Sequence, residues 1–266
     1  MGSINPVILL PHVLKSSALS IAKSFLTSLT TGTGQFCVCP GLIIAIEDES
    51  LKAFEQHLSD LLNEHSAGVM LTPSIYQSYQ DTAKARATAN NCQLVASGKS
   101  ASETQQGLYT PSLIYKTLAS TFIAEPSLQT EMFGHSALIV SCQSIDEIEQ
   151  VISSLSGQLS AAIHGEEDEL LANKTLLNNT KQKVGRLVIN GFTTGVEVCE
   201  AMMHGGPFPA STDVRFTSVG TAAIARFLRP ICFQNCPDSL LPAALKNDNP
   251  LGLNRSVNGE YTKQAL

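Results

Sequence analysis

Apolar residues in this chain follow two patterns that alternate along the sequence. Short apolar runs, typical of strands covered on both faces of a sheet, lie at residues 5–10, 42–46, 93–96, 138–141, 159–163 and 185–190. Helical periodicity, caps and end charges predict helices at residues 12–29, 51–62, 73–89, 144–155 and 166–183. Because strands and helices alternate with short connections, the pattern predicts an α/β fold, a mostly parallel sheet covered by helices.

Polar and charged residues mark the ends of these elements. Asp48 and Ser50 offer a cap to the second helix, and Asp146 and Glu147 lie in the first turn of another, where acids suit the helix dipole. Residues 97–111 are predicted to be mostly loop. From Pro237 onward the chain is rich in Pro, Asn and Gly, which predicts an irregular C-terminal tail.

Composition narrows the function classes. The 266 residues, 43% of them hydrophobic, are enough for one large domain or two small ones. The net charge is −6, and the sequence has no basic run and no tryptophan, so a phosphate-neutralising nucleic-acid surface is not expected. The apolar run at residues 7–10 is too short to cross a bilayer and has no basic region before it, so neither a membrane span nor a secretory signal is expected.

The seven cysteines are odd in number and scattered, which does not suggest a disulfide framework. We expect most of them to be reduced, buried and apolar in character, and we expect a cytoplasmic protein. Cys37 and Cys39, and Cys232 and Cys236, have spacings that zinc ligands can use, but no histidine pair lies nearby. No metal site is predicted.

Cys37 is the strongest candidate for chemistry. It lies in the stretch TGTGQFCVCPG, residues 31–41, where three glycines and a proline predict an exposed loop. Glycines there expose backbone N–H groups, which can stabilise a thiolate and the oxyanion that forms when sulfur attacks a carbonyl. The local sequence alone leaves open the ordinary alternative, a buried cysteine in a turn.

Three motifs, in this order, resemble the aldehyde dehydrogenase superfamily: GQFC with PG at residues 34–41, TEMFG at 130–134, and GRLVING at 185–191, the strand that ends in Asn beside the substrate funnel. Four more segments resemble the branch that oxidises 2-oxoglutarate semialdehyde (2,5-dioxopentanoate), and they lie at residues 2–6, 204–211, 226–230 and 249–252. That branch usually has F-C-T-N-P-G in the cysteine loop. Val38 and Cys39 replace Thr and Asn here and make the surroundings of the sulfur less polar.

The resemblance implies that Cys37 attacks an aldehyde, that hydride passes to NAD or NADP, and that the thioester is hydrolysed. It also implies that Glu131 binds the nicotinamide ribose and that Phe133 lies against the nicotinamide. Without the resemblance, Glu131 is an ordinary loop residue and Phe133 an ordinary core residue. No motif ties a histidine to Cys37, and His204 is assigned a structural role in its His-Gly-Gly-Pro turn, so no Cys-His dyad is predicted.

Enzymes of this family are about twice as long, and their first half carries a Rossmann-type cofactor domain, whose G-x-G-x-x-G motif is not found here. Met1 corresponds to the position directly after the family's general-base glutamate. We therefore expect residues 1–227 to form the catalytic domain without its cofactor domain, and residues 228–266 to form a strand and tail used for oligomerisation. The chain alone is expected to be inactive as a dehydrogenase.

Two other functions stay open. The chain could be a non-catalytic oligomerisation or interaction module derived from the enzyme, with apolar surface available for a partner. It could also be an independent cysteine hydrolase, although no base for Cys37 is identified. The partners expected are a small aldehyde substrate and either further copies of this chain or the missing N-terminal half.

Overall fold

The computed structural model describes residues 2–89, 92–102 and 106–266. Met1 and residues 90, 91 and 103–105 lie outside the described residues. Residues 103–105 belong to the loop that the sequence predicts at residues 97–111. Contacts divide the chain into two compact units, Met1–Arg226 and Phe227–Leu266, and each is described by itself. No described helix is both long enough and apolar enough to cross a membrane.

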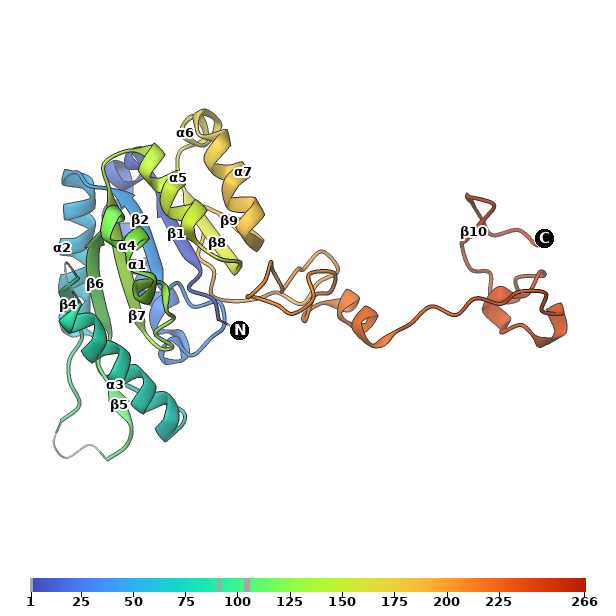
Figure 1. Cartoon of the computed structure of the whole chain (residues 1–266), viewed down its shortest axis with the longest axis horizontal. Helices are drawn as coiled ribbons and strands as arrows, with labels where there is room; N and C mark the ends of the chain where they lie inside the picture. The colour runs from blue at the N-terminus through green and yellow to red at the C-terminus, as the bar shows by residue number, and fades with distance from the viewer. Residues whose placement is uncertain (1, 90–91, 103–105) are drawn as a thin grey trace. The chain divides into compact units, whose positions relative to one another are not determined.

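The first unit is built on a seven-stranded sheet (Figure 1). In spatial order its strands are β4 (Gln93–Ser97), β6 (Leu113–Leu118), β7 (Ser136–Cys142), β2 (Leu42–Ile46), β1 (Pro6–Leu9), β8 (Gln158–His164) and β9 (Val184–Ile189). All neighbours pair in parallel except β4, which lies antiparallel to β6 at one edge. The predicted α/β fold with a mostly parallel sheet is therefore confirmed.

Helices cover both faces of this sheet. The structure has α1 (Pro11–Thr30), α2 (Glu49–Glu64), α3 (Pro73–Thr88), α4 (Ala119–Ala124), α5 (Ile145–Ser154), α6 (Glu167–Ala172) and α7 (Lys174–Lys183). Single turns of 3₁₀ helix lie at Thr31–Gly34 and Pro126–Gln129, and the two-residue strands β3 (Gly68–Val69) and β5 (Tyr109–Thr110) pair with each other. Helices α1 and α2 cover one face, and α5 and α7 lie on the other (Figure 1).

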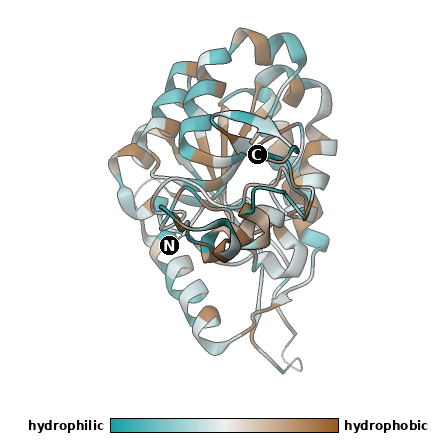
Figure 2. Cartoon of the chain, turned by 90° about the vertical axis from the view of Figure 1, so that its right-hand side faces the viewer, coloured by the Kyte–Doolittle hydropathy of each residue, from teal (hydrophilic) through white to brown (hydrophobic). Residues whose placement is uncertain are grey.

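The two faces are separated residue by residue along each strand, because successive side chains of a strand point to opposite faces. Val7 and Ile43 pack with the apolar residues of α1 and α2, whereas Ile8 and Ile44 pack with those of α5 and α7. Both clusters are buried, which explains why these strands are continuous apolar runs. Figure 2 shows the helices as mixtures of hydrophobic and hydrophilic segments, as expected for elements with one buried face.

The caps that the sequence predicts are present. The Asp48 carboxylate accepts hydrogen bonds from the backbone N–H groups of Ser50 and Leu51, both at 2.8 Å. The Ser144 hydroxyl accepts one from the backbone of Glu147 at 3.3 Å. These bonds satisfy N–H groups that the first turn of a helix leaves unpaired, so α2 and α5 begin where the sequence indicates.

Several elements differ from the prediction, and the short elements α4, β3 and β5 are not among those predicted. The helix expected at residues 166–183 is divided into α6 and α7 at Asn173, whose backbone leaves the helical region and whose side-chain amide donates to the carbonyl of Glu169 at 2.8 Å. Strand β6 was not predicted at all. It carries a lysine, Lys116, in its interior, and only groups from other elements make that position acceptable within the sheet.

The second unit consists mostly of turns. It contains single 3₁₀ turns at Asp238–Leu240 and Ala243–Leu245 and one hairpin of β10 (Arg255–Val257) and β11 (Glu260–Thr262). The Asn249 side chain holds the unit together by donating to the carbonyls of Leu253 and Lys263 at 2.9 and 2.8 Å. This irregular segment includes the tail that the sequence predicts from Pro237 onward.

Candidate active site

A cavity of about 460 Å³ lies against the loops that precede the strands of the sheet. Cys37, Glu131 and Phe133, the three residues singled out from the sequence, all line it, together with His204 and Arg226. Cys37 comes before β2 and Glu131 comes before β7, and these two strands are parallel neighbours. Loops that enter parallel neighbours meet at the same edge of the sheet, which is how residues about a hundred positions apart come to share one cavity.

The cysteine loop is fixed against the Glu131 segment by a contact between backbones. Gly34 has a positive φ of 66°, and a Cβ atom there would lie 2.4 Å from the carbonyl carbon of Gly134. Only glycine fits such an approach, since any side chain would overlap the neighbouring main chain. Gly34 therefore sets the separation between the cysteine loop and the segment that carries Glu131 and Phe133.

Side chains from other elements capture three successive carbonyl groups of the cysteine loop. The buried Asn5 amide donates to the carbonyls of Cys37 and Cys39 at 3.0 and 2.9 Å. The buried Thr193 hydroxyl donates to the carbonyl of Val38 at 2.7 Å. Asn5 has a positive φ of 46°, a conformation that asparagine tolerates well. Sequence reasoning missed both residues, although Asn5 lies in the resemblance segment at residues 2–6.

The two cysteines of the loop have opposite environments. The Cys39 thiol is buried beside the carbonyls of Leu29 and Gly134, and burial raises its pKa to about 12. Cys37 is exposed at the cavity. Partial burial raises its thiol pKa, and the charge of Glu131 adds to this effect, while the backbone N–H groups of Cys37 and Val38 and the charge of Arg186 oppose it. Cys37 is thus the thiol that a ligand can reach.

An imidazole contacts that thiol. His204 Nε2 lies 3.2 Å from Cys37 Sγ, within hydrogen-bond range for sulfur. Sequence reasoning gave His204 a structural role and paired no histidine with Cys37, whereas the structure brings the two side chains into contact. The 167 positions between the two residues leave no local pattern that could reveal the pair. The contact depends on the way residues 204–218 fold back on themselves through Thr217 and Ser218.

Glu131 and Phe133 add a carboxyl group and an aromatic ring to the cavity wall. Burial raises the pKa of the Glu131 carboxyl, and a hydrogen bond to the backbone of Ser3 opposes that shift. A carboxylate can accept from ribose hydroxyls, and the half-buried Phe133 ring beside it offers an apolar face to a planar ring. Both residues, which the sequence singled out, therefore face one cavity that Cys37 also lines.

Asn190, which the resemblance put beside the substrate funnel, is not among the residues that line the cavity with Cys37. It follows the carboxyl end of β9, whereas Cys37 precedes the amino end of β2. Its side chain is hydrogen-bonded to the main chain of Gly165. It accepts from the Gly165 N–H at 2.9 Å and donates to the Gly165 carbonyl at 3.0 Å. Within the part of the chain that the structure describes, no group of His, Cys, Asp and Glu side chains could hold a metal ion.

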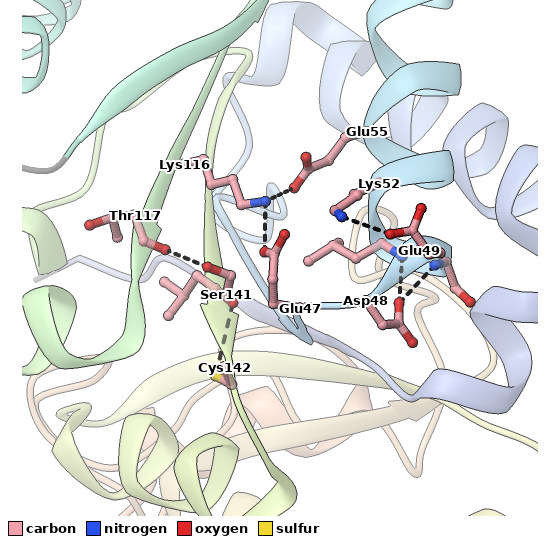
Figure 3. A network of polar contacts seen from close by, with 12 residues as sticks. Glu47, Asp48, Glu49, Lys52, Glu55, Lys116, Thr117, Ser141 and Cys142 are labelled. Carbon is pink, nitrogen blue, oxygen red and sulfur yellow. Dashed lines mark hydrogen bonds and ion pairs between the residues drawn. The ribbon is translucent and has the colours of Figure 1, made fainter.

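A second polar cluster lies at the opposite, carboxyl edge of the sheet (Figure 3). The Lys116 ammonium group lies 2.7 Å from the Glu47 carboxylate and 2.8 Å from the Glu55 carboxylate. Burial lowers the pKa of Lys116, but the bonds to both carboxylates outweigh it, so the pKa is raised. Burial raises the pKa of Glu55 more than its bond to Lys116 lowers it.

The comparisons with known proteins agree with this geometry. A model described as the aldehyde dehydrogenase family matches residues 1–215. Alpha-ketoglutaric semialdehyde dehydrogenase 2 of Azospirillum brasilense is 42% identical over 260 residues, which are 98% of this chain and 49% of that protein. Alpha-ketoglutaric semialdehyde dehydrogenase of Acinetobacter baylyi is 40% identical over 263 residues, 99% of this chain and 50% of that protein. The chain thus spans about half the length of the curated relatives it matches.

A solved structure shows the same fold. A betaine aldehyde dehydrogenase double mutant from Staphylococcus aureus, in complex with NAD+, matches 85% of this chain and 45% of its own with a TM-score of 0.65 and 16% identity. The family model covers most of the first unit, and two relatives at 40–42% identity cover nearly all of the chain. The chain therefore belongs to the aldehyde dehydrogenase family.

Proposed function

We propose that this chain is the cysteine-bearing half of an NAD(P)+-dependent aldehyde dehydrogenase, with Cys37 as its nucleophile. The observation that carries the proposal is the position of the Cys37 thiol on the wall of the 460 Å³ cavity that Glu131 and Phe133 also line. A nucleophile must be reachable by its electrophile, and Cys37 meets that condition whereas Cys39 in the same loop does not.

The cavity supplies groups for the first step of the chemistry. The sulfur of Cys37 adds to the aldehyde carbon, and the carbonyl electron pair moves to oxygen beside the N–H groups of Cys37 and Val38. Bound NAD(P)+ would accept the hydride that leaves the same carbon. Water then releases the carboxylic acid from the Cys37 thioester and restores the thiol. Glu131 and Phe133 would hold the nicotinamide riboside end.

We propose 2,5-dioxopentanoate as the substrate, because both curated relatives are alpha-ketoglutaric semialdehyde dehydrogenases. This molecule carries a carboxylate at one end and the aldehyde at the other. Arg226 lines the cavity that contains Cys37 and offers a guanidinium group for that carboxylate. The substrate is thus expected to lie with its carboxylate toward Arg226 and its aldehyde toward the sulfur.

The oxidation can be tested in a chimera. The matched 260-residue region of the Azospirillum brasilense enzyme is replaced by this chain, and aldehyde-dependent NAD(P)H formation is followed at 340 nm. We expect activity that a Cys37→Ser substitution lowers by at least about 10³-fold, since the covalent step is lost. Cys39→Ser in the same chimera is the matched control. A folded chimera whose activity does not depend on Cys37 would contradict the proposal.

We expect the 266-residue chain alone to form no steady-state NAD(P)H. Much of the binding energy of a dinucleotide comes from groups remote from the reacting carbon, and the sequence contains no G-x-G-x-x-G fingerprint for them. The first, reversible step is still open to test. The semialdehyde should slow alkylation of Cys37 but not of the exposed Cys232 in the same molecule.

An oligomerisation role is a second candidate, favoured by apolar exposure in the unit Phe227–Leu266. Phe227 is 83% exposed, and Leu228 and Ile231 are 65% and 60% exposed. Exposed apolar residues gathered in one segment are typical of interaction surfaces. Sedimentation of the full chain and of an F227D/I231D variant would test this. We expect an oligomer that the two substitutions dissociate, and identical sedimentation would argue against the role.

A further inference from the structure

We propose that His204 is the base that takes the proton from the Cys37 thiol as the sulfur attacks. The inference rests on the proposed role of Cys37 as nucleophile, but its test needs neither aldehyde nor cofactor. Its basis is the 3.2 Å separation between Cys37 Sγ and His204 Nε2, at a cavity that both residues line. A general base must lie within hydrogen-bond reach of the proton that it removes, and His204 does.

The turn that carries His204 is held in place on both sides of the residue. Its backbone N–H donates to the Thr217 hydroxyl at 2.8 Å. Its carbonyl accepts from both the backbone N–H and the hydroxyl of Ser218, at 2.9 and 2.8 Å. These hydrogen bonds fix the main chain of His204, so the ring it carries can keep Nε2 directed at the sulfur.

The protonation states suit a transfer from sulfur to nitrogen. Burial lowers the pKa of His204, and the charge of Arg186 lowers it further, so the ring is neutral at pH 7 and Nε2 can accept a proton. Burial raises the pKa of Cys37, so the thiol carries its proton at the same pH. Among the described residues, the charged side chains that line the cavity are Glu131 and Arg226, one of each sign.

The proposed step balances. The S–H bond breaks, its proton goes to Nε2, and the sulfur electron pair forms the S–C bond. With an aldehyde, the carbonyl electron pair moves to oxygen, which can then take the proton back from the imidazolium. With iodoacetamide, iodide leaves with the electrons of the C–I bond and the proton stays on His204. The base is needed because a thiol with a raised pKa is almost entirely protonated at neutral pH.

The test is the pH profile of Cys37 alkylation by iodoacetamide in the full chain, followed peptide by peptide with mass spectrometry. In the native chain we expect two rises in rate, one below the ordinary histidine pKa of 6.5 and one above the ordinary cysteine pKa of 9.0. His204→Gln should lose the first rise and react about 10²-fold more slowly at neutral pH, the size typical of a lost general base.

Two references make the experiment specific. The same substitution at an exposed histidine, His12→Gln, should leave the profile unchanged, and Cys232 should alkylate at one rate in every variant. An H204Q chain that keeps the first rise and reacts within about twofold of the native rate would overturn the role of His204. That result would leave the proposed role of Cys37 as nucleophile standing, because protection of Cys37 by semialdehyde is measured separately.

A second measurement covers the case in which H204Q does not fold. The His204 ring is followed by NMR through a pH titration before and after the Cys37 thiol is blocked with methyl methanethiosulfonate. We expect the titration midpoint of His204 to move when its S–H partner is removed. An unmoved His204 midpoint would contradict the proposal.

Discussion

The two edges of the sheet hold their ionisable groups in opposite ways. At the carboxyl edge, Lys116 is shared between the carboxylates of Glu47 and Glu55 at 2.7 and 2.8 Å, so opposite charges compensate one another (Figure 3). At the amino edge, the side chain that contacts the Cys37 thiol is a neutral imidazole. Compensated charges hold elements together, whereas a neutral donor and acceptor pair beside a cavity is free to exchange a proton with a ligand.

The two edges are also built differently. The Lys116 cluster joins β6, α2 and the end of β2 through long side chains. The cysteine loop is held through its own main chain, by Asn5 and Thr193 on its carbonyls and by Gly34 against Gly134. Contacts to the main chain therefore hold the part of the loop around Cys37, while the Cys37 side chain stays exposed at the cavity.

Asn5→Asp should give the largest effect. The substitution keeps shape and replaces the two N–H donors to the carbonyls of Cys37 and Cys39 by an acceptor in a fully buried place. We expect a loss of about 3–5 kcal/mol in the free energy of unfolding, measured by urea denaturation. Asn190→Asp, at the carboxyl edge, is the control, since Asn190 loses one donated bond and keeps an accepted one. Equal losses would remove the distinction between the edges.

Lys116→Met should cost about 2 kcal/mol at neutral pH, because it leaves Glu47 and Glu55 unpaired in a partly buried place. The deficit should shrink at acid pH, because burial raises the pKa of Glu55 and its protonation removes the repulsion between the two side chains. In the native chain the raised pKa of Lys116 gives stability that is present below the ordinary lysine pKa of 10.5 and is lost as pH rises through the folded value.

The control for Lys116 is Lys52→Met, since Lys52 pairs with Glu49 in an exposed place. Exposed pairs contribute little, so we expect no measurable change in the free energy of unfolding. Cys37 should alkylate at the native rate in both variants, because neither lysine lines its cavity. A slower Cys37 in the Lys116 variant alone would show that the two edges are coupled.

Cys39→Ala should cost about 1 kcal/mol, the usual result of removing a small buried group. The alkylation rate of Cys37 should stay within about twofold, because the Asn5 bond to residue 39 uses the backbone carbonyl and not the thiol. Thermal unfolding and peptide mass spectrometry measure the two quantities. A large fall in the Cys37 rate would show that the sulfur of Cys39 shapes the loop.

Glu131→Gln should have the smallest effect, and it should speed the alkylation of Cys37. The negative charge of Glu131 raises the pKa of Cys37, so its removal should lower that pKa and speed alkylation at about pH 8 by two- to fivefold. Glu64→Gln, at an exposed position paired with Lys99, is the control. A slower reaction in the Glu131 variant would reverse the electrostatic argument for the cavity.

Much of the fold follows from the sequence because the strands of the first unit are covered on both faces. Burial on both faces makes β1, β2 and β7 continuous apolar runs, which stand out between amphipathic helices. Strand β6 does not stand out because Lys116 interrupts it. The carboxylates that make this lysine tolerable come from residues 47 and 55, far away in the sequence. No local pattern reports such a partner.

The site divides in the same manner. Cys37, Glu131 and Phe133 were found through short motifs, and the structure places all three at one cavity. His204 and Thr193 escaped because their roles depend on distant contacts: each reaches the cysteine loop across more than a hundred and fifty positions. From the sequence, a single histidine in a glycine-proline turn suggests a structural role, and only the fold shows that a thiol contacts it.

The main-chain contact between Gly34 and Gly134 has a consequence for how this family can diverge. The close approach of Gly34 to the main chain of Gly134 limits how near the cysteine loop lies to the Glu131 segment. Neighbouring positions can then accept new residues, as Val38 and Cys39 do here, without displacing the reactive atom. Substitutions in the lining of such a cavity would change which molecules can enter it, while the Cys37 sulfur would keep its position.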